Sequence, residues 1–375
     1  MGDKSRIEWC DATYNPITGC SPVSEACRNC YASRMIGRNL PKMGHVGPFS
    51  QVQFHPDRLD QPLRWKKPRR IFVCSMGDLF HEDVPMEWLD KVFDVMEGGD
   101  SDYRNGRWCP GLWHTFMILT KRPDRMKSYI EFRLGKKQAY ADQFKKCPTA
   151  EMQDSPAARW AQQAARGDFY PIWLGVTAEN QEMADQRIPI LLQTPAAVRF
   201  VSVEPMLGRV DLKRYLFGAQ ARKVLLDAGG SLEGLPAHLV PPPSLDWVIC
   251  GGESGPGARP LHPDWPRSLR DQCQSAGVPF FFKQWGEWAD AQTAGIHQSG
   301  PVMSKKGAVN DWMRQRVRFA DGREAVFQAH RWTAHATNLM FRVGKKDAGC
   351  LLDGRAHKQF PTERGRDELR SQRAV

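Results

Sequence analysis

Three cysteines lie within the stretch Gly19-Cys20-Ser21-Pro22-Val23-Ser24-Glu25-Ala26-Cys27-Arg28-Asn29-Cys30-Tyr31-Ala32, at the spacing C-x6-C-x2-C. The next cysteine is Cys74, too distant to complete the set at this spacing. A structural zinc site has four protein ligands, whereas a site with three keeps one position open. The spacing leaves two interpretations: an iron–sulfur cluster held by three thiolates, or zinc with Cys10, His45 or His55 as fourth ligand.

Composition narrows the class of protein. The chain has 375 residues, enough for one large core or two modest ones, and a formal net charge of +11. That charge favours a polyanionic partner such as DNA or a nucleotide, the alternative being a merely basic surface. Ten scattered cysteines do not suit a disulfide scaffold, and we find neither a membrane-spanning apolar run nor a signal peptide. We therefore expect a reduced, cytoplasmic protein.

Short apolar runs alternate with helix-like segments, a pattern typical of parallel β–α–β units. The runs that predict strands are 11–19, 70–74, 115–119, 172–176, 198–203, 247–250 and 280–283. Polar or charged residues follow most of them: Asp78, Lys121, Glu179, Glu204, Glu253 and Lys283. In a barrel of parallel strands these ends share one face, which carries the active site. Because the cysteine loop follows the first strand, we expect it on that face.

A family resemblance adds to this pattern. The ending Cys27-Arg28-Asn29-Cys30-Tyr31-Ala32 resembles the C-x-x-C-Y ending of the cysteine loop of radical S-adenosylmethionine (SAM) enzymes, although their usual first gap is three residues. From Trp9 to about Pro361 the chain resembles a phage and prophage family of radical-SAM-like three-cysteine proteins, including a C-terminal motif at 343–355. This resemblance implies that Cys20, Cys27 and Cys30 hold a [4Fe–4S] cluster whose fourth iron binds SAM.

The resemblance also implies a fold: an α/β chain with a partial (β/α)6-type parallel barrel of the radical SAM kind. We assign residues 1–288 to this barrel and residues 127–170 to a polar, helix-prone insertion within it. Residues 289–375 are assigned to a C-terminal extension that covers the barrel.

The resemblance places cofactor contacts at the strand ends. In radical SAM enzymes the loop after the second strand binds the methionine amino group of SAM, and later strand ends contact its remaining parts. The matching residues here are Ser75, Asp78, Glu179, Asn180, Ser202 and Glu204. For Asp78 and Asn180, capping of the following helix is the alternative role.

A second polar group is predicted to bind substrate. The glycine-rich stretch 251–256 fits neither a dinucleotide motif nor a P-loop. A polar group with one aromatic surrounds it: Glu253, Arg259, Lys283, Gln284 and Trp285. We predict that Trp285 stacks on a base, the alternative being a packed interior with an internal Glu253–Lys283 ion pair. A basic rim around the barrel mouth is predicted from Arg64, Lys66, Lys67, Lys121, Arg122, Lys345 and Lys346.

The activity implied by the resemblance is reductive cleavage of SAM to a 5′-deoxyadenosyl radical that abstracts hydrogen from a substrate carbon. Phage context suggests an isomerase of DNA hypermodification that converts N-α-glycinyl-thymidine to C-α-glycinyl-thymidine. It would use an electron donor such as flavodoxin or ferredoxin in the host cytoplasm. The alternatives are a radical SAM lyase that repairs DNA photoproducts and a non-catalytic, metal-stabilised DNA-binding protein.

Overall fold

The computed structural model describes most of the chain. The described residues are 5–38, 44–97, 103–104, 107–108, 114–146, 172–228, 235–290, 293, 296–303, 312–319, 324–331 and 339–361. No helix within these ranges is long and apolar enough to cross a membrane.

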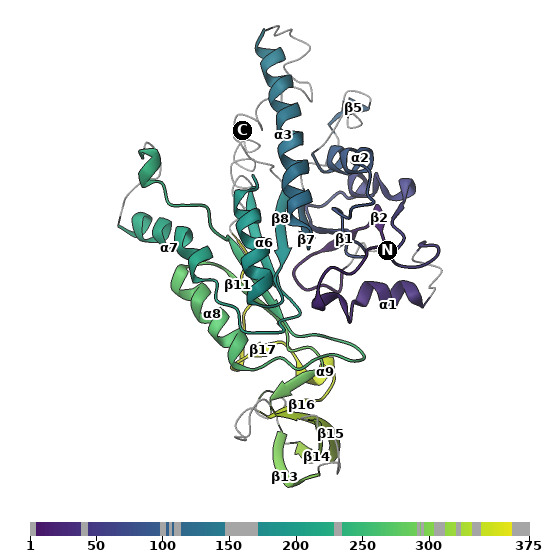
Figure 1. Cartoon of the computed structure of the whole chain (residues 1–375), viewed down its shortest axis with the longest axis vertical. Helices are drawn as coiled ribbons and strands as arrows, with labels where there is room; N and C mark the ends of the chain where they lie inside the picture. Colours follow the sequence, from purple (N-terminus) through teal and green to yellow (C-terminus); the bar gives the residue numbers. More distant parts are fainter. Residues whose placement is uncertain are drawn as a thin grey trace.

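A curled sheet of seven parallel strands forms a half-barrel (Figure 1). Its strands stand side by side in chain order: β1 (Ala12–Tyr14), β4 (Arg70–Val73), β7 (Thr115–Thr120), β8 (Ile172–Thr177), β9 (Val198–Val203), β10 (Trp247–Gly251) and β11 (Phe280–Gln284). In a doubly wound sheet the strand order reverses at one point, and here it does not. The sheet therefore curls toward a barrel. The predicted partial α/β barrel is confirmed at this level.

The first strand is shorter than predicted. It ends at Tyr14, and Ile17–Thr18 forms a separate strand, β2, that pairs antiparallel with β3 (Gln53–Phe54). Pro16 separates the two strands, because proline has no N–H to donate to a ladder. Four residues, 15–18, therefore separate the end of β1 from the start of the cysteine loop at Gly19.

Helices connect the strands of the half-barrel. They are α1 (Tyr31–Gly37), α2 (Met86–Glu97), α3 (Pro123–Lys146), α6 (Gln181–Gln193), α7 (Lys213–Asp227) and α8 (Asp264–Ala276). Short 3-10 turns lie at η1 (Glu25–Cys27), η3 (Pro56–Arg58), η4 (Gln61–Arg64) and η7 (Ala237–Leu239), and β5 (Tyr103–Arg104) pairs with β6 (Arg107–Trp108). Helix α3 occupies the first part of the predicted insertion, and residues 147–170 lie outside the described residues.

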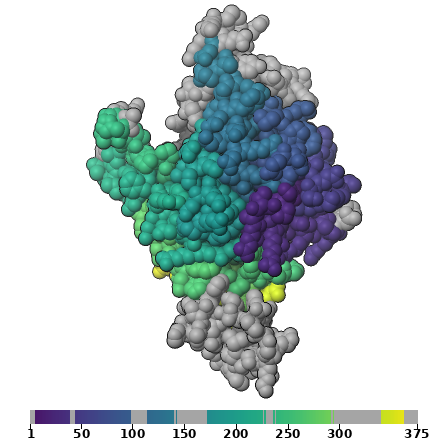
Figure 2. Space-filling view, viewed as in Figure 1, coloured from purple at the N-terminus to yellow at the C-terminus, as the bar shows by residue number. Residues whose placement is uncertain are grey.

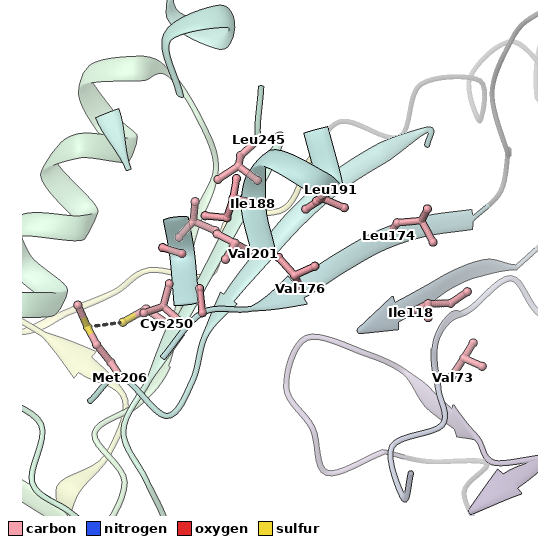
Figure 3. Packing of buried hydrophobic residues seen from close by; sticks show 14 of the residues in the cluster. Val73, Ile118, Leu174, Val176, Ile188, Leu191, Val201, Met206, Leu245 and Cys250 are labelled. Carbon is pink, nitrogen blue, oxygen red and sulfur yellow. Dashed lines mark hydrogen bonds between the residues drawn. The ribbon is translucent and has the colours of Figure 1, made fainter. Parts of the chain in front are cut away.

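The main core lies between the outer face of the sheet and the helices. Alternate strand residues point outward, as strand geometry requires, so Val73, Ile118 and Leu174 face this core. Figure 3 shows these side chains together with Ile188 and Leu191 of α6. The five residues are buried, with no more than 1% of each exposed. This packing fixes the helices on the convex side of the half-barrel.

The inner face of the sheet carries a second core, which we call the aromatic floor. Its buried members alternate with those of the outer core along the strands: Trp9, Cys10, Phe72, Met117, Trp173, Val198, Phe200, Trp247, Ile249 and Phe281. Phe360 packs against Trp247 with ring centroids 5.3 Å apart. The floor fills the part of the half-barrel near the amino ends of the strands.

A five-stranded antiparallel sheet lies at one end of the molecule in Figure 1. Its order is β12 (Trp288–Asp290), β16 (Leu339–Arg342), β15 (Glu324–Arg331), β14 (Trp312–Phe319) and β13 (Ile296–Met303). The chain continues through α9 (Lys345–Ala348), β17 (Leu351–Leu352) and β18 (Arg355–Ala356). The predicted domain division at residue 288 stays a prediction.

The segment after β18 runs along the free edge of the half-barrel. Phe282 N donates to His357 O at 2.8 Å, and Gln359 N donates to Phe280 O at 3.2 Å. The ammonium of Lys358 pairs with the carboxylate of Glu8, ahead of β1. Residues 357–360 thus cover part of the gap between the two edge strands.

We expect Gly252→Ala to destabilise the protein. A Cβ at Gly252 would lie 1.9 Å from the carbonyl oxygen of Trp285, where two backbone segments meet just after β10 and β11. Backbone relaxes less readily than a side chain, so we expect a loss of at least about 1–3 kcal/mol in the free energy of unfolding. Urea unfolding measures this loss.

The matched control is Gly135→Ala, in the interior of α3, where an added Cβ would meet nothing within 4 Å. The same change should raise stability there by roughly 0.5–1 kcal/mol, because alanine favours helix over glycine. Equal effects of the two substitutions would contradict the close approach at Gly252.

Candidate active site at the barrel mouth

The cysteine loop begins at the carboxyl end of the sheet. Gly19 forms a parallel bridge with Gly77, and Gly19 N donates to Met76 O at 3.0 Å. Gly19 has φ +96°, and a Cβ there would lie 2.4 Å from Gln51 O. Only glycine suits both the backbone angle and this close approach. The loop therefore starts beside the loop that follows β4, at the carboxyl ends of the strands.

Three unpaired thiols lie on this loop, and Figure 2 shows the N-terminal segment that carries it at the surface. Cys20, Cys27 and Cys30 are each half-buried. Cys27 ends the turn η1, and Cys30 immediately precedes α1. The hydroxyl of Tyr31 donates to Ser75 O, which ties the start of α1 to the loop after β4.

Different neighbours act on the thiols. Burial raises the pKa of Cys20 to about 11, with Asp78 adding to the rise and Arg122 opposing it. Burial also raises the pKa of Cys27, but the nearby Lys121 ammonium and hydrogen bonds from Val23 and Ser24 outweigh it, so that pKa is lowered overall. The thiolate form, which binds metals, therefore forms more readily at Cys27 than at Cys20.

A set of contacts that we call the latch joins the loop to the end of β10. Asn29 Nδ2 donates to Glu253 Oε2 and to Gly257 O, each at 2.9 Å. Arg259 binds Glu253 with its backbone N at 2.8 Å and its guanidinium at 2.8 and 2.9 Å. Arg259 also reaches Glu25 Oε1 at 2.9 Å. The loop therefore crosses the mouth from β1 to β10.

The predicted substrate role of Glu253 needs correction. Only 6% of this residue is exposed, and Arg259 and Asn29 occupy its carboxylate, so it holds the loop. Burial raises the pKa of Glu253, but these hydrogen bonds outweigh burial and lower that pKa. The predicted alternative of a Glu253–Lys283 pair is wrong, because Lys283 pairs with Glu204.

The pair formed by Glu204 and Lys283 lies on the inner face above the aromatic floor. Lys283 Nζ lies 2.7 Å from Glu204 Oε1, and each side chain is less than a fifth exposed. The two residues come from β11 and the end of β9, with β10 between them. Gly251 of β10 makes this possible, because a Cβ there would lie 3.3 Å from Glu204 Cδ. Opposite charges thus meet inside the half-barrel.

Two of the predicted SAM contacts have structural roles. The Asp78 carboxylate is 5% exposed and accepts four hydrogen bonds, from Phe80 N, Thr120 Oγ1, Lys121 N and Arg122 Nη1. It ties the end of β7 to the loop after β4, has no capacity left for an ammonium ligand, and does not cap α2. Asn180 caps α6, accepting from Met183 N at 2.9 Å, as its alternative role predicted.

The other predicted SAM contacts lie at the mouth. Glu179 is fully buried and binds Arg187 at 2.9 Å, while its Oε1 makes no hydrogen bond within the described residues. Burial raises the pKa of Glu179, but the nearby Ser24 hydroxyl and Arg187 guanidinium outweigh burial and lower it. Ser75 donates to Asn15 Oδ1 at 3.2 Å, and Ser202 is buried on the inner face.

The other predicted substrate residues lie in different environments. Trp285 is fully buried in the outer core and donates from its indole N–H to Leu351 O at 2.8 Å. It therefore offers no face to a base, and that prediction is wrong. Gln284 is buried, and its Oε1 has no hydrogen-bond partner among the described residues. Arg259 belongs to the latch.

The predicted basic rim is only partly at the mouth. Arg64, Lys66 and Lys67 precede β4, at the amino ends of the strands, so they lie on the wrong side of the barrel. Arg122 is buried in ion pairs. The exposed Lys345 and Lys346 begin α9, and Gly344 N donates to Glu287 O just beyond β11. Lys121 is the other rim cation at the mouth, and within the described ranges it makes no ion pair.

The candidate zinc ligands have other partners. Thr18 Oγ1 lies 2.7 Å from His45 Nδ1 and 2.8 Å from His55 Nε2. The thiol of Cys10 donates a hydrogen bond to Ser5 Oγ, and the residue belongs to the aromatic floor. Among the residues described, no three His, Cys, Asp or Glu side chains are arranged to hold one metal ion. A [4Fe–4S] cluster has a different requirement, since it binds each thiolate at a separate iron.

Sequence reasoning missed several residues of the site. Asn29, Arg187 and the Ser21–His81 pair, whose Oγ and Nε2 atoms are 2.7 Å apart, hold the loop or its neighbours. Each is a polar residue near a predicted site residue. Their partners lie 8 to 228 positions away, so no local pattern reveals them.

These observations define a class: an α/β half-barrel protein with a three-cysteine loop pinned across its mouth. Residues 4–361 match a family described as a protein of unknown function (DUF5131), and the chain belongs to this family. No curated protein and no solved structure matches the chain. The resemblance of the loop to radical SAM enzymes stays a prediction.

We expect Glu253→Gln to release the latch. A lowered folded-state pKa means that the carboxylate stabilises the fold above the ordinary glutamate pKa of 4.5, and that this contribution is lost as the pH falls through the lowered value. At pH 7 the substitution should cost roughly 1.5–3 kcal/mol, and it should flatten the dependence of stability on pH in acid. Urea unfolding at pH 7 and across the acid range measures both.

The control is Glu87→Gln, because Glu87 is exposed and pairs with Lys91 on the surface of α2. That change should stay within about 0.5 kcal/mol. Glu253→Gln protein with the stability and pH dependence of the parent would show that the latch does not hold the loop.

Proposed function

We propose that this protein is a radical SAM enzyme that acts on a modified DNA base or nucleotide. The observation that supports this most is the position of the cysteine loop. Three reduced thiols lie on one loop after the first strand, at the carboxyl ends of a half-barrel whose parallel strands follow chain order. In α/β barrels this face carries the chemistry.

The donor set suits a [4Fe–4S] cluster. Cys20, Cys27 and Cys30 would hold it, and the fourth iron would be free for SAM. When bound, the cluster and SAM supply one-electron cleavage of SAM and hydrogen-atom abstraction from a substrate carbon. The chain's own part is to orient ligands and exclude water. The aromatic floor closes the barrel below the site, and the latch fixes the loop above it.

The polar groups of the inner face support a zwitterionic ligand. Glu204 suits an ammonium and Lys283 suits a carboxylate, so an amino-acid group could exchange partners with this ion pair. Lys121 stands near Cys27 and Glu179 and suits a second anionic group. SAM and a glycine adduct of thymine each carry an amino-acid group. Ser75, Ser202, Glu179 and Gln284 complete the polar lining that we propose for SAM or substrate.

The reaction that we propose converts N-α-glycinyl-thymidine to C-α-glycinyl-thymidine. The bond between glycine nitrogen and the thymine 5-methyl carbon breaks, and a bond from that carbon to the glycine α-carbon forms. The α-carbon loses one hydrogen and the nitrogen gains one, so substrate and product have equal mass. The net charge of +11 supports a nucleic-acid or nucleotide substrate. The electron donor would be a flavodoxin or ferredoxin.

We expect single replacement of Cys20, Cys27 or Cys30 by alanine to abolish cluster binding. Each variant would leave an iron without its thiolate, so reconstituted protein should lose the brown absorbance and its iron and sulfide. Cys350→Ala is the control, since this cysteine is half-buried like the other three but lies after α9. One tightly bound zinc per chain with no iron would contradict the proposal.

We expect Lys283→Met and Glu204→Gln to keep the cluster and lose product. Loss of one charge-assisted contact costs about 1.5–3 kcal/mol, roughly 10- to 100-fold in kcat/KM. The assay supplies DNA that carries N-α-glycinyl-thymidine and follows 5′-deoxyadenosine and product. Persisting SAM cleavage without product would assign the pair to substrate, and lost cleavage would assign it to SAM. Normal turnover in both variants would remove the pair from the site.

The same assay, repeated with DNA that carries a thymine photoproduct, separates the alternative functions. Product of unchanged mass indicates the isomerase, whereas release of repaired thymine from a photoproduct indicates the lyase. Reduced protein that binds DNA but forms no 5′-deoxyadenosine would be a binding protein and would overturn the proposed enzyme.

A further inference from the structure

Arg122 is a buried cation that directly contacts a cysteine of the loop. It follows β7, and only 5% of its side chain is exposed. Its Nη1 lies 3.4 Å from Cys20 Sγ. A buried guanidinium needs anionic or hydrogen-bonding partners, so its placement at a thiol requires explanation.

Every nitrogen of the Arg122 guanidinium is engaged. Nε lies 2.8 Å from both carboxylate oxygens of Glu82, and Nη1 lies 3.2 Å from Asp78 Oδ2 as well as contacting Cys20. Nη2 donates to Ser21 O at 3.2 Å and Ser21 Oγ at 2.9 Å. The planar fork is thus held in one orientation by two carboxylates, with its remaining donors directed at the loop.

The contacts with Ser21 restrain the long first gap of the loop, between Cys20 and Cys27. Six residues separate Cys20 from Cys27, which gives that part of the loop more freedom than a shorter gap would. Arg122 contacts Cys20 and Ser21, where the gap begins. His81 Nε2 also lies 2.7 Å from Ser21 Oγ. The latch holds the other side of the loop through Glu25 and Asn29. The gap is therefore anchored near both of its ends.

We infer that Arg122 is a positioning residue that fixes Cys20 as a cluster ligand and, through its N–H···S contact, raises the reduction potential of the cluster. This inference rests on the proposed function. A donor at a ligand sulfur stabilises negative charge there, and the reduced cluster carries one more negative charge than the oxidised cluster. The Arg122 side chain is only 5% exposed, so solvent screens this contact less than it would screen a surface pair.

Arg122→Lys tests this inference. Lysine keeps the positive charge and can pair with Asp78, but it lacks the fork that reaches Cys20, Ser21 and Glu82 together. At a fixed solution potential we expect the ratio of reduced to oxidised cluster to fall about tenfold, equivalent to ~59 mV for a one-electron couple. The potential is measured by anaerobic titration with dithionite and electron paramagnetic resonance. We also expect faster loss of iron to a chelator.

The matched control is Arg133→Lys. Arg133 is similarly buried, with 3% of its side chain exposed, and pairs with Asp90, Asp94 and Glu97 between α2 and α3. This change can lower stability but should leave the cluster potential unchanged. A purely structural role of Arg122 would make the two variants alike in potential.

A second variant covers the case in which Arg122→Lys does not fold. Glu82→Gln removes the negative charge that orients Nε, and Glu82 is 63% exposed, so the variant should fold. We expect faster iron loss to the chelator without a lower potential, because the contact with Cys20 remains while an anion is removed. Parental iron retention in this variant would overturn the positioning role.

The outcomes of these experiments distinguish failure of this inference from failure of the proposed function on which it rests. Parent protein that forms a cluster, with Arg122→Lys showing the parental potential and iron retention, overturns the inference alone. Parent protein that takes up no iron and sulfide overturns both. A lowered potential in Arg122→Lys and a parental potential in Arg133→Lys support it.

Discussion

The inner face of the half-barrel must be shielded from water, and much of the structure follows from this requirement. Parallel sheets are stable with both faces covered, and the helices that the structure describes pack against the outer face. The aromatic floor covers the inner face near the amino ends of the strands. There Trp247 packs edge-on against Trp9 and Trp173, with ring centroids 6.4 and 6.0 Å apart. Polar groups on the inner face are therefore concentrated toward the carboxyl ends, beside the cysteine loop.

The strands were predictable because each is a short apolar run that ends at polar residues. The cysteine loop and the shared face of the strand ends followed from the same local signals. The pairing of side chains across the mouth did not, because it depends on strand register. Gly251 illustrates this: the missing side chain on β10 lets Glu204 reach Lys283 across an intervening strand.

The orientation of Trp285 shows a second limit of sequence reasoning. Lys283 and Trp285 are two positions apart and would share a face in an unbroken strand. However, β11 ends at Gln284, and the register between β10 and β11 shifts after Cys250. Trp285 then turns into the outer core and bonds to Leu351, whereas Lys283 stays on the inner face. The two-residue alternation predicts which way a side chain points only within a regular strand, and it fails at strand ends. Active-site residues of such folds lie at these ends.

The aromatic floor also has a consequence for how the chain is made. It combines Trp9 with Phe360, and the nearby ion pair joins Glu8 to Lys358, which is 350 positions later. On the ribosome, every strand of the half-barrel emerges long before Phe360 does. Until Phe360 emerges, Trp247 and Phe281 of the nascent sheet lack the ring that packs on them, and transiently exposed apolar surface of this kind is prone to aggregation.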